Sequence, residues 1–251
     1  MDIRHFSFIG SYIKRIEKNI LELGFQKGLR REIEKSNSKF LVLGRDEIKE
    51  ILTKAPVVIV FNHQYEIETI ACLTALPDRE DIFLVATHFL KGLLPAIDKH
   101  LISIYVRQRK ITWRKFSAFI LENFISKEKI TSEDKHRKNI KSINEAAEKV
   151  KQGGLVMITP NPHNKKWQTG IGWLINNIGP TQQAYYVKMY VANSSFLDYL
   201  RLVPVFGWIL PTVKVYFSQP IKLNKIWQQD GKKLTFELER EYNDWVKGLN
   251  K

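Results

Sequence analysis

The sequence lacks several features that would assign a protein to a class at once. It has one cysteine, Cys72, among 251 residues, so it cannot form an internal disulfide, and we expect it in a reducing compartment. No stretch approaches the roughly 18 uninterrupted apolar residues of a membrane-spanning helix. The first residues, Met1 to His5, lack the apolar core of a secretory signal. We therefore expect neither a membrane-spanning nor a secreted protein.

Acidic residues are also few relative to basic ones. Lys and Arg number 40 against 26 Asp and Glu, which gives a net charge of +14. Such a chain attracts nucleic acids, anionic membranes or phosphorylated small molecules. The sequence contains no zinc-ligand spacing, RNP-type strand or clear helix-turn-helix, so nucleic-acid binding is supported by net charge alone and is not expected. No cluster of His, Cys and Asp has metal-ligand spacing, so no metal is expected.

Apolar runs and helical periods alternate along most of the chain, which predicts an α/β fold. Such alternation is typical of a mainly parallel sheet covered by helices on both faces. We expect an N-terminal amphipathic helical arm over 1–39 and one α/β domain over 40–251. The predicted strands are 40–43, 57–61, 82–86, 102–106, 155–159, 184–191 and 212–217, and the predicted helices are 67–76, 89–98, 112–126, 136–152, 170–178 and 234–249.

The arm contains a predicted amphipathic helix at residues 6–25. Its apolar residues recur at spacings of three and four, namely Phe6, Ile9, Ile13, Ile16, Ile20 and Leu23. Two alternatives stay open, because the stripe could pack on the domain or lie on an anionic lipid surface. In the second case the basic residues after it, Lys27, Arg30, Arg31 and Lys35, would contact headgroups. The apolar stretch 203–210 could add a second lipid contact, or form a buried strand or loop.

The most informative motif is Asn62-His63-Gln64-Tyr65-Glu66-Ile67-Glu68, which directly follows the apolar run 57–61. Open α/β sheets build their sites at the carboxyl ends of strands. Histidine accepts a proton near neutral pH, and a carboxylate on the next turn can hold one ring nitrogen. The motif therefore predicts a general base, His63, oriented by Glu68. A purely structural role in capping the helix stays open.

Four blocks in this order resemble the glycerolipid acyltransferase superfamily, which includes the glycerol-3-phosphate and 1-acylglycerol-3-phosphate O-acyltransferases. The resemblance runs from about Leu43 to Ile221. The blocks are 57–69 with its Asn-His-Gln-x-x-x-Glu pattern, 104–110 with its basic end, the Gly-Gly strand at 153–160, and the late strand at 213–221. The resemblance implies an acyltransferase-like fold.

Two departures from the family pattern stand out. Glu68 occupies the position where the family usually has Asp, so the side chain is one methylene longer. The third block continues as Pro160-Asn161-Pro162-His163-Asn164-Lys165-Lys166, where the family usually has Pro-Glu-Gly-Thr-Arg. The two lysines keep the positive charge but lack the bidentate fork of arginine. The change bears on substrate identity more than on fold.

The resemblance implies direct transfer of a fatty acyl group from acyl-CoA or acyl carrier protein, without a cofactor. The acceptor would be the hydroxyl of glycerol-3-phosphate, lysophosphatidate or a related lipid. His63 and Glu68 would be catalytic, and the substrate-binding residues would be Asn62, Arg107, Arg109, Asn161, His163, Lys165 and Lys166. Because parallel strands end at one edge, we expect 107–109 and 161–166 to border the His63 pocket.

The resemblance also implies a cytoplasmic protein, peripheral on the inner face of an anionic membrane, because its acceptor or product is a lipid. The altered third block motivates an alternative, a catalytically degenerate acyltransferase fold that binds lipid or a partner.

Overall fold

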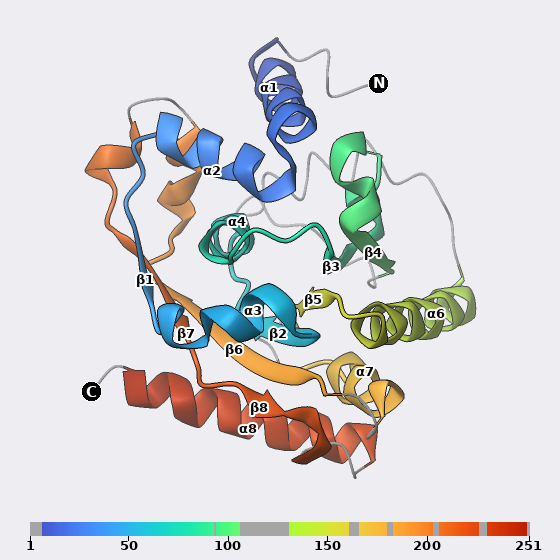
Figure 1. Ribbon diagram of the computed structural model, residues 1–251. Coiled ribbons are helices and arrows are strands. Elements are labelled where there is room, and N and C mark those ends of the chain that lie inside the picture. Colours follow the sequence, from blue (N-terminus) through green and yellow to red (C-terminus); the bar gives the residue numbers. More distant parts are fainter. Residues whose placement is uncertain are drawn as a thin grey trace.

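The computed structural model describes residues 7–92, 94–105, 131–160, 166–179, 183–202, 206–225 and 230–249. An eight-stranded sheet forms the centre of this part of the chain (Figure 1). Its order is β1-β7-β6-β2-β5-β3-β4, and β8 pairs with β6. The strands are β1 (Phe40–Leu43), β2 (Val57–Phe61), β3 (Ile82–Thr87), β4 (Leu101–Ile104), β5 (Leu155–Ile158), β6 (Tyr185–Ala192), β7 (Val213–Phe217) and β8 (Ile221–Lys222).

The direction of the strands confirms the predicted fold class. Strands β2 to β6 run parallel to one another, whereas β7 and β8 pair with β6 in the antiparallel sense. The parallel strands therefore end at one common edge, which we call the carboxyl edge. In open sheets of this kind, ligands bind outside that edge.

Strand β2 lies inside the sheet and is buried on both faces. Its residues are at most 1% exposed, which explains their continuous apolar character. Because successive side chains of a strand alternate between faces, Val57, Ile59 and Phe61 enter one core and Val58 and Val60 enter the other.

Helices cover both faces of the sheet. On one side lie α1 (Ser7–Leu23), α2 (Phe25–Lys35), α3 (Lys49–Lys54) and α4 (Glu66–Ala75), and on the other lie α6 (Ser132–Lys151), α7 (Gly170–Ile178) and α8 (Gly231–Leu249). Figure 1 shows α1, α2 and α4 across the sheet from α7 and α8. Six short 3-10 helices join these elements in the described residues: η2 (Asp46–Ile48), η3 (His88–Leu90), η4 (Pro95–His100), η6 (Phe196–Leu202), η7 (Phe206–Ile209) and η8 (Leu223–Lys225).

The predicted helix 89–98 is wrong. Two 3-10 helices, η3 and η4, occupy this span instead. Gly92 adopts a left-handed backbone with φ 84°, which interrupts a right-handed helix, and Pro95 starts the second turn. Helix α2 lies within the predicted helical arm 1–39 but beyond its predicted helix 6–25, α3 was not predicted, and the predicted helix 112–126 lies outside the described residues.

Three residues of the apolar stripe of α1 pack against the domain, as the first of the two alternatives predicts, whereas Leu23 of the stripe is 38% exposed. Ile13, Ile16 and Ile20 are 9%, 8% and 4% exposed. The helices α1 and α2 approach closely at Gly28, where a Cβ atom would lie 2.7 Å from the backbone of Ile20. The buried carboxylate of Glu32 on α2 is paired across this contact with Arg15 at 2.8 Å. Phe6 lies outside the described residues.

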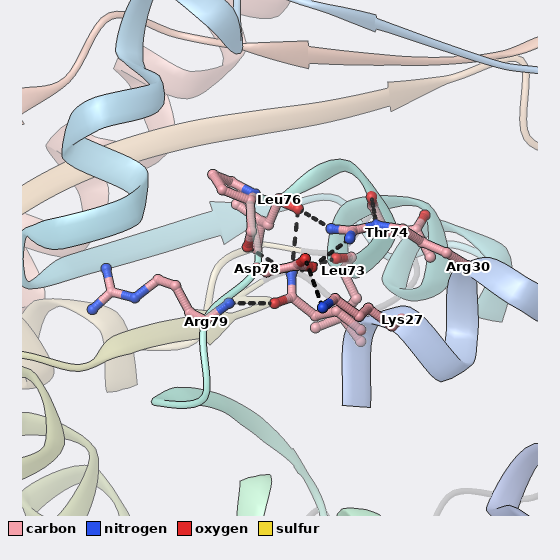
Figure 2. A network of polar contacts seen from close by, with 9 residues as sticks. Lys27, Arg30, Leu73, Thr74, Leu76, Asp78 and Arg79 are labelled. Atoms are coloured by element: carbon pink, nitrogen blue, oxygen red, sulfur yellow. Dashed lines mark hydrogen bonds and ion pairs between the residues drawn. The ribbon is translucent and has the colours of Figure 1, made fainter. Parts of the chain in front are cut away.

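Helix α2 is in turn fastened to the carboxyl-terminal end of α4. Figure 2 shows Lys27 and Arg30 reaching from α2 to this end and to Asp78. Arg30 Nε donates to the carbonyl of Thr74 at 2.9 Å, and the side-chain Nε2 of Gln26 donates to the carbonyl of Leu73 at 3.1 Å. The last carbonyls of a helix have no partner within it, so these contacts satisfy groups that would otherwise be unpaired.

Candidate functional site

The chain leaves β2 through Asn62, whose side chain continues the pairing between β2 and β6. Its Nδ2 donates to the carbonyl of Val191 at 2.9 Å, and its Oδ1 accepts from the amide of Val191 at 2.8 Å. These two bonds fix the chain direction at the carboxyl edge and so set the position of His63. A substrate-binding role for Asn62 stays a prediction, and it would have to use the remaining hydrogen-bonding capacity of the amide.

His63 lies half-buried directly after this anchor. Its Nδ1 is 3.4 Å from Oγ1 of Thr69, which stands on the first turns of α4. The contact is long, and which atom donates depends on the tautomer of the ring. If Nδ1 carries the hydrogen and Thr69 accepts it, Nε2 is left unprotonated and can act as a base.

Glu68 is fully buried and caps the amino-terminal end of α4. Its Oε2 accepts from the backbone amide of Tyr65 at 2.8 Å, which is the capping contact that stayed open from the sequence. Its Oε1 accepts from Oγ of Ser194 at 2.6 Å. The proposal that Glu68 orients His63 stays a prediction.

Burial raises the pKa of Glu68 from 4.5 to about 7, against the opposing effect of hydrogen bonds from Ser194, Tyr65 and Gln64. Near neutral pH the carboxyl group is therefore divided between its neutral and charged forms. Groups whose pKa lies near the working pH are common at catalytic sites. Burial also raises the pKa of the Cys72 thiol, one turn further along α4, so this side chain packs as a neutral apolar group.

The ends of the neighbouring strands meet the same edge. Ile158 at the end of β5 pairs with Val60 of β2, so Thr159 and Pro160 leave the sheet beside Asn62. The hydroxyl of Thr159 is buried and has no hydrogen-bond partner among the residues that the structure describes. Strand β4 ends at the same edge, three strands from β2.

Most of the predicted basic site lies outside the described residues. This applies to Arg107, Arg109, Asn161, His163 and Lys165, so their convergence on the His63 pocket stays a prediction. Lys166 is described and exposed, and it borders a surface groove of about 360 Å³ formed mainly by α8. Its role in phosphate binding also stays a prediction.

Sequence reasoning missed Ser194 and Thr69. Ser194 follows Asn193, whose φ of 63° is left-handed, and Asn followed by Ser is a turn signal after a strand. That signal predicts a turn at the carboxyl edge, but nothing in the sequence pairs its hydroxyl with an acid 126 positions away.

The part of the chain that the structure describes contains neither a candidate metal site nor a candidate membrane span. There, no group of three or more His, Cys, Asp and Glu could hold a metal ion. Nor does any helix in these residues have the length and apolarity to cross a membrane.

The comparisons with known proteins include a likeness to a solved structure. No protein-family model matches the chain, and no curated protein matches it. The fold is similar to the crystal structure of the 1-acyl-sn-glycerophosphate (LPA) acyltransferase PlsC from Thermotoga maritima, with a TM-score of 0.51 and 14% identity. The match covers 97% of this chain and 89% of that one. At this identity the likeness concerns the fold, and we conclude that the chain has an acyltransferase-like fold over nearly its whole length.

Proposed function

We propose that the chain is an O-acyltransferase. It would move a fatty acyl group from acyl-CoA or acyl carrier protein to the hydroxyl of glycerol-3-phosphate, lysophosphatidate or a related lipid acceptor. The observation that carries the proposal is the position of His63. It follows a buried strand inside the sheet, at the carboxyl edge, in a chain whose fold is similar to that of an LPA acyltransferase.

In this proposal His63 acts as the general base. Nε2 of His63 takes the proton of the acceptor hydroxyl while the hydroxyl oxygen attacks the thioester carbonyl. The tetrahedral intermediate collapses, the carbon–sulfur bond breaks, and the imidazolium returns the proton to the leaving thiolate. A base positioned for such a step contributes typically ~10²- to 10⁴-fold to the rate.

The other residues would hold His63 and the acceptor. In the tautomer that this step requires, Thr69 would accept from Nδ1 and Nε2 would carry no hydrogen, and the charged form of Glu68 would favour the imidazolium that develops during the step. The phosphate of the acceptor would be held by the basic group Arg107, Arg109, Lys165 and Lys166, with Asn62, Asn161 and His163 as further contacts. We place the reaction at the inner face of an anionic membrane, where a lipid acceptor or product is available.

One experiment tests the activity directly. The chain is incubated with labelled acyl-CoA, or with acyl carrier protein charged with a labelled fatty acid, and a panel of phosphorylated glycerols and lysolipids. The products are read by lipid mass spectrometry. We expect an acylated lipid that is lost in His63→Ala.

The same experiment decides the second candidate function. The sequence 160–166 lacks the customary arginine, which favours a degenerate acyltransferase fold that binds lipid or a partner without turnover. If the parent chain acylates none of the acceptors with either donor but retains vesicle or lysolipid binding, this candidate replaces the transferase.

A further inference from the structure

The connection between β6 and β7 displays large apolar side chains to solvent. Phe196, Leu197 and Leu200 of η6 are 50%, 57% and 39% exposed, and Trp208 and Ile209 of η7 are 62% and 53% exposed. We call these five side chains the apolar platform. In a 3-10 helix residues three apart share a face, so Leu197 and Leu200 lie together, and η6 packs against η7. Single exposed apolar residues are ordinary, whereas a group of this size marks an interaction surface.

The interior of the same connection is charged. Asp198 and Arg201 are 4% and 3% exposed and pair at 2.6 Å between Oδ1 and Nε. Arg201 also donates from Nη2 to the carbonyl of Pro211 at 2.6 Å. Charged residues point inward and apolar residues outward, which is the reverse of an ordinary surface loop. A buried pair is costly to desolvate, so its use here indicates that the shape of the connection matters.

The platform stands beside the candidate acyl-transfer site. The connection starts at the carboxyl edge of β6, where β2 also ends. Its second residue after the strand is tied to the candidate site by the hydrogen bond between Ser194 Oγ and Glu68 Oε1. A lipid that contacts the platform would therefore lie near the edge that carries His63.

The far end of the platform rests on the end of α2. The amide of Gly207 donates to the carbonyl of Ser36 at 3.0 Å, and a Cβ atom at Gly207 would overlap that oxygen, so only glycine allows this approach. Around Ser36 the exposed basic residues are Arg31, Lys35 and Lys39 against the acids Glu32 and Glu34, because Lys27 and Arg30 of the same segment pair with Asp78. Of these two acids, Glu32 is buried and paired with Arg15 and Lys35.

We propose that the apolar platform is a lipid-contacting surface that seats the protein on an anionic bilayer. Trp208 and its apolar neighbours would enter the interface, and Arg31, Lys35 and Lys39 would face the headgroups. Tryptophan and long aliphatic side chains next to lysine and arginine are the composition of interfacial contacts. Ile13, Ile16 and Ile20 of α1 are buried, so these three side chains are not available for such a contact. The inference deepens the proposed function by naming the surface that meets the lipid, and its test needs no turnover.

Vesicle flotation tests the surface. The full chain is mixed with phosphatidylcholine vesicles that contain or lack phosphatidylglycerol. We expect flotation with the anionic vesicles that weakens with salt, and about tenfold weaker partitioning for the double variant Leu197→Ser with Trp208→Ser. The matched control is Phe236→Ser on α8, whose side chain is 57% exposed on the opposite side of the sheet, and which should float like the parent.

A labelled cysteine shows whether the platform itself enters the lipid. Cys72 is 0% exposed, so a thiol-reactive, polarity-sensitive dye should react with an introduced cysteine and not with the native one. The dye on Trp208→Cys should shift to an apolar environment when anionic vesicles are added, and the dye on Phe236→Cys should not. His63→Ala should float like the parent, so loss of transfer and loss of membrane contact are separable.

Two outcomes overturn the inference. In the first, the dye at position 208 stays in water although the protein floats, or the double variant floats like the parent. In the second, the dye shifts with protein concentration in the absence of vesicles and sedimentation shows a dimer, which makes the platform a contact between two copies of this chain.

Discussion

Ser194 Oγ donates a 2.6 Å hydrogen bond to Oε1 of Glu68 and so joins the connection after β6 to the start of α4. The carboxyl group of Glu68 is fully buried, and this burial raises its pKa to about 7. A hydrogen bond to the charged form of an acid lowers its pKa, so Ser194 keeps Glu68 more acidic than burial alone would. The hydroxyl is therefore a positioning group for the candidate site.

Replacing Ser194 by alanine should raise the pKa of Glu68 further. If the charged form of Glu68 supports His63, the rising limb of the kcat/KM profile should move to higher pH. The loss of one partner of a buried carboxyl group should also cost about 1–3 kcal/mol of unfolding free energy. Ser195→Ala is the control, because Ser195 uses its backbone amide for its contact to Asp198. A profile that stays in place for Ser194→Ala in a folded protein would contradict the coupling.

The stability of the chain should depend on pH through Glu68. Its folded-state pKa is raised from 4.5 to about 7, so the folded state favours the neutral acid, and this stabilisation is complete below about pH 4.5. It is lost as pH rises through about 7, by an amount on the order of 3 kcal/mol. Glu68→Gln lacks the titration, so the stability of the parent relative to this variant should fall over that range.

Denaturant unfolding of the parent and of Glu68→Gln at about pH 5 and about pH 8 measures the change. Only the difference between the two proteins is compared, because other groups titrate in both. If the difference in unfolding free energy between the parent and Glu68→Gln is the same at both pH values, the carboxyl group of Glu68 does not have a raised pKa in the folded state. Glu68→Asp is informative for activity: part of the transfer should remain, since the family that the motif resembles usually has Asp.

His63→Ala should lower acyl transfer by ~10²-fold or more without unfolding the chain, as expected for loss of a positioned base. Thermal unfolding of the variant checks that the fold is intact, and the half-buried position of His63 makes this outcome reasonable. Turnover at the parental rate in the folded variant would remove His63 from the mechanism.

Thr69→Val tests the hydroxyl beside His63 Nδ1. The substitution keeps the shape and removes the hydrogen bond, so we expect kcat to fall about tenfold, the equivalent of one bond of about 1.4 kcal/mol. KM should change little, because the hydroxyl would act on the base and not on the acceptor. Thr69→Ser restores the hydroxyl and should recover most of the rate. Equal rates for the valine and serine variants would leave the 3.4 Å contact without a catalytic role.

The sheet could be predicted from the sequence almost strand by strand. The apolar run 57–61 is β2 in full, because a strand buried on both faces needs an apolar residue at every position. The edge at which His63 lies follows from that strand. The contacts of Glu68 could not be predicted, because Ser194 approaches it through the fold and is distant in sequence.

Some other elements could not be predicted, because the sequence contains no helical or strand periodicity at their positions. Helices η6 and η7 are too short for a helical period, and the apolar stretch 203–210, which contains η7, is equally consistent with a buried segment and with a lipid contact. The stripe of α1 was ambiguous for a different reason: a helix packed on α2 and a helix lying on lipid bury the same residues. Only the position of α2 decides between them.

The hydrogen bonds between α2 and the end of α4 limit where the chain could be truncated or recombined. The side-chain amide of Gln26 donates to the carbonyls of Leu73 and Pro77 and accepts from the backbone amide of Arg79. Arg30 donates to the carbonyl of Thr74. A truncated chain that starts at residue 40 would leave the carbonyls at the end of α4 without these partners, and α4 is the helix that carries Glu68 and Thr69. A graft, a permuted chain or a truncated chain therefore has to include α2 wherever it includes α4.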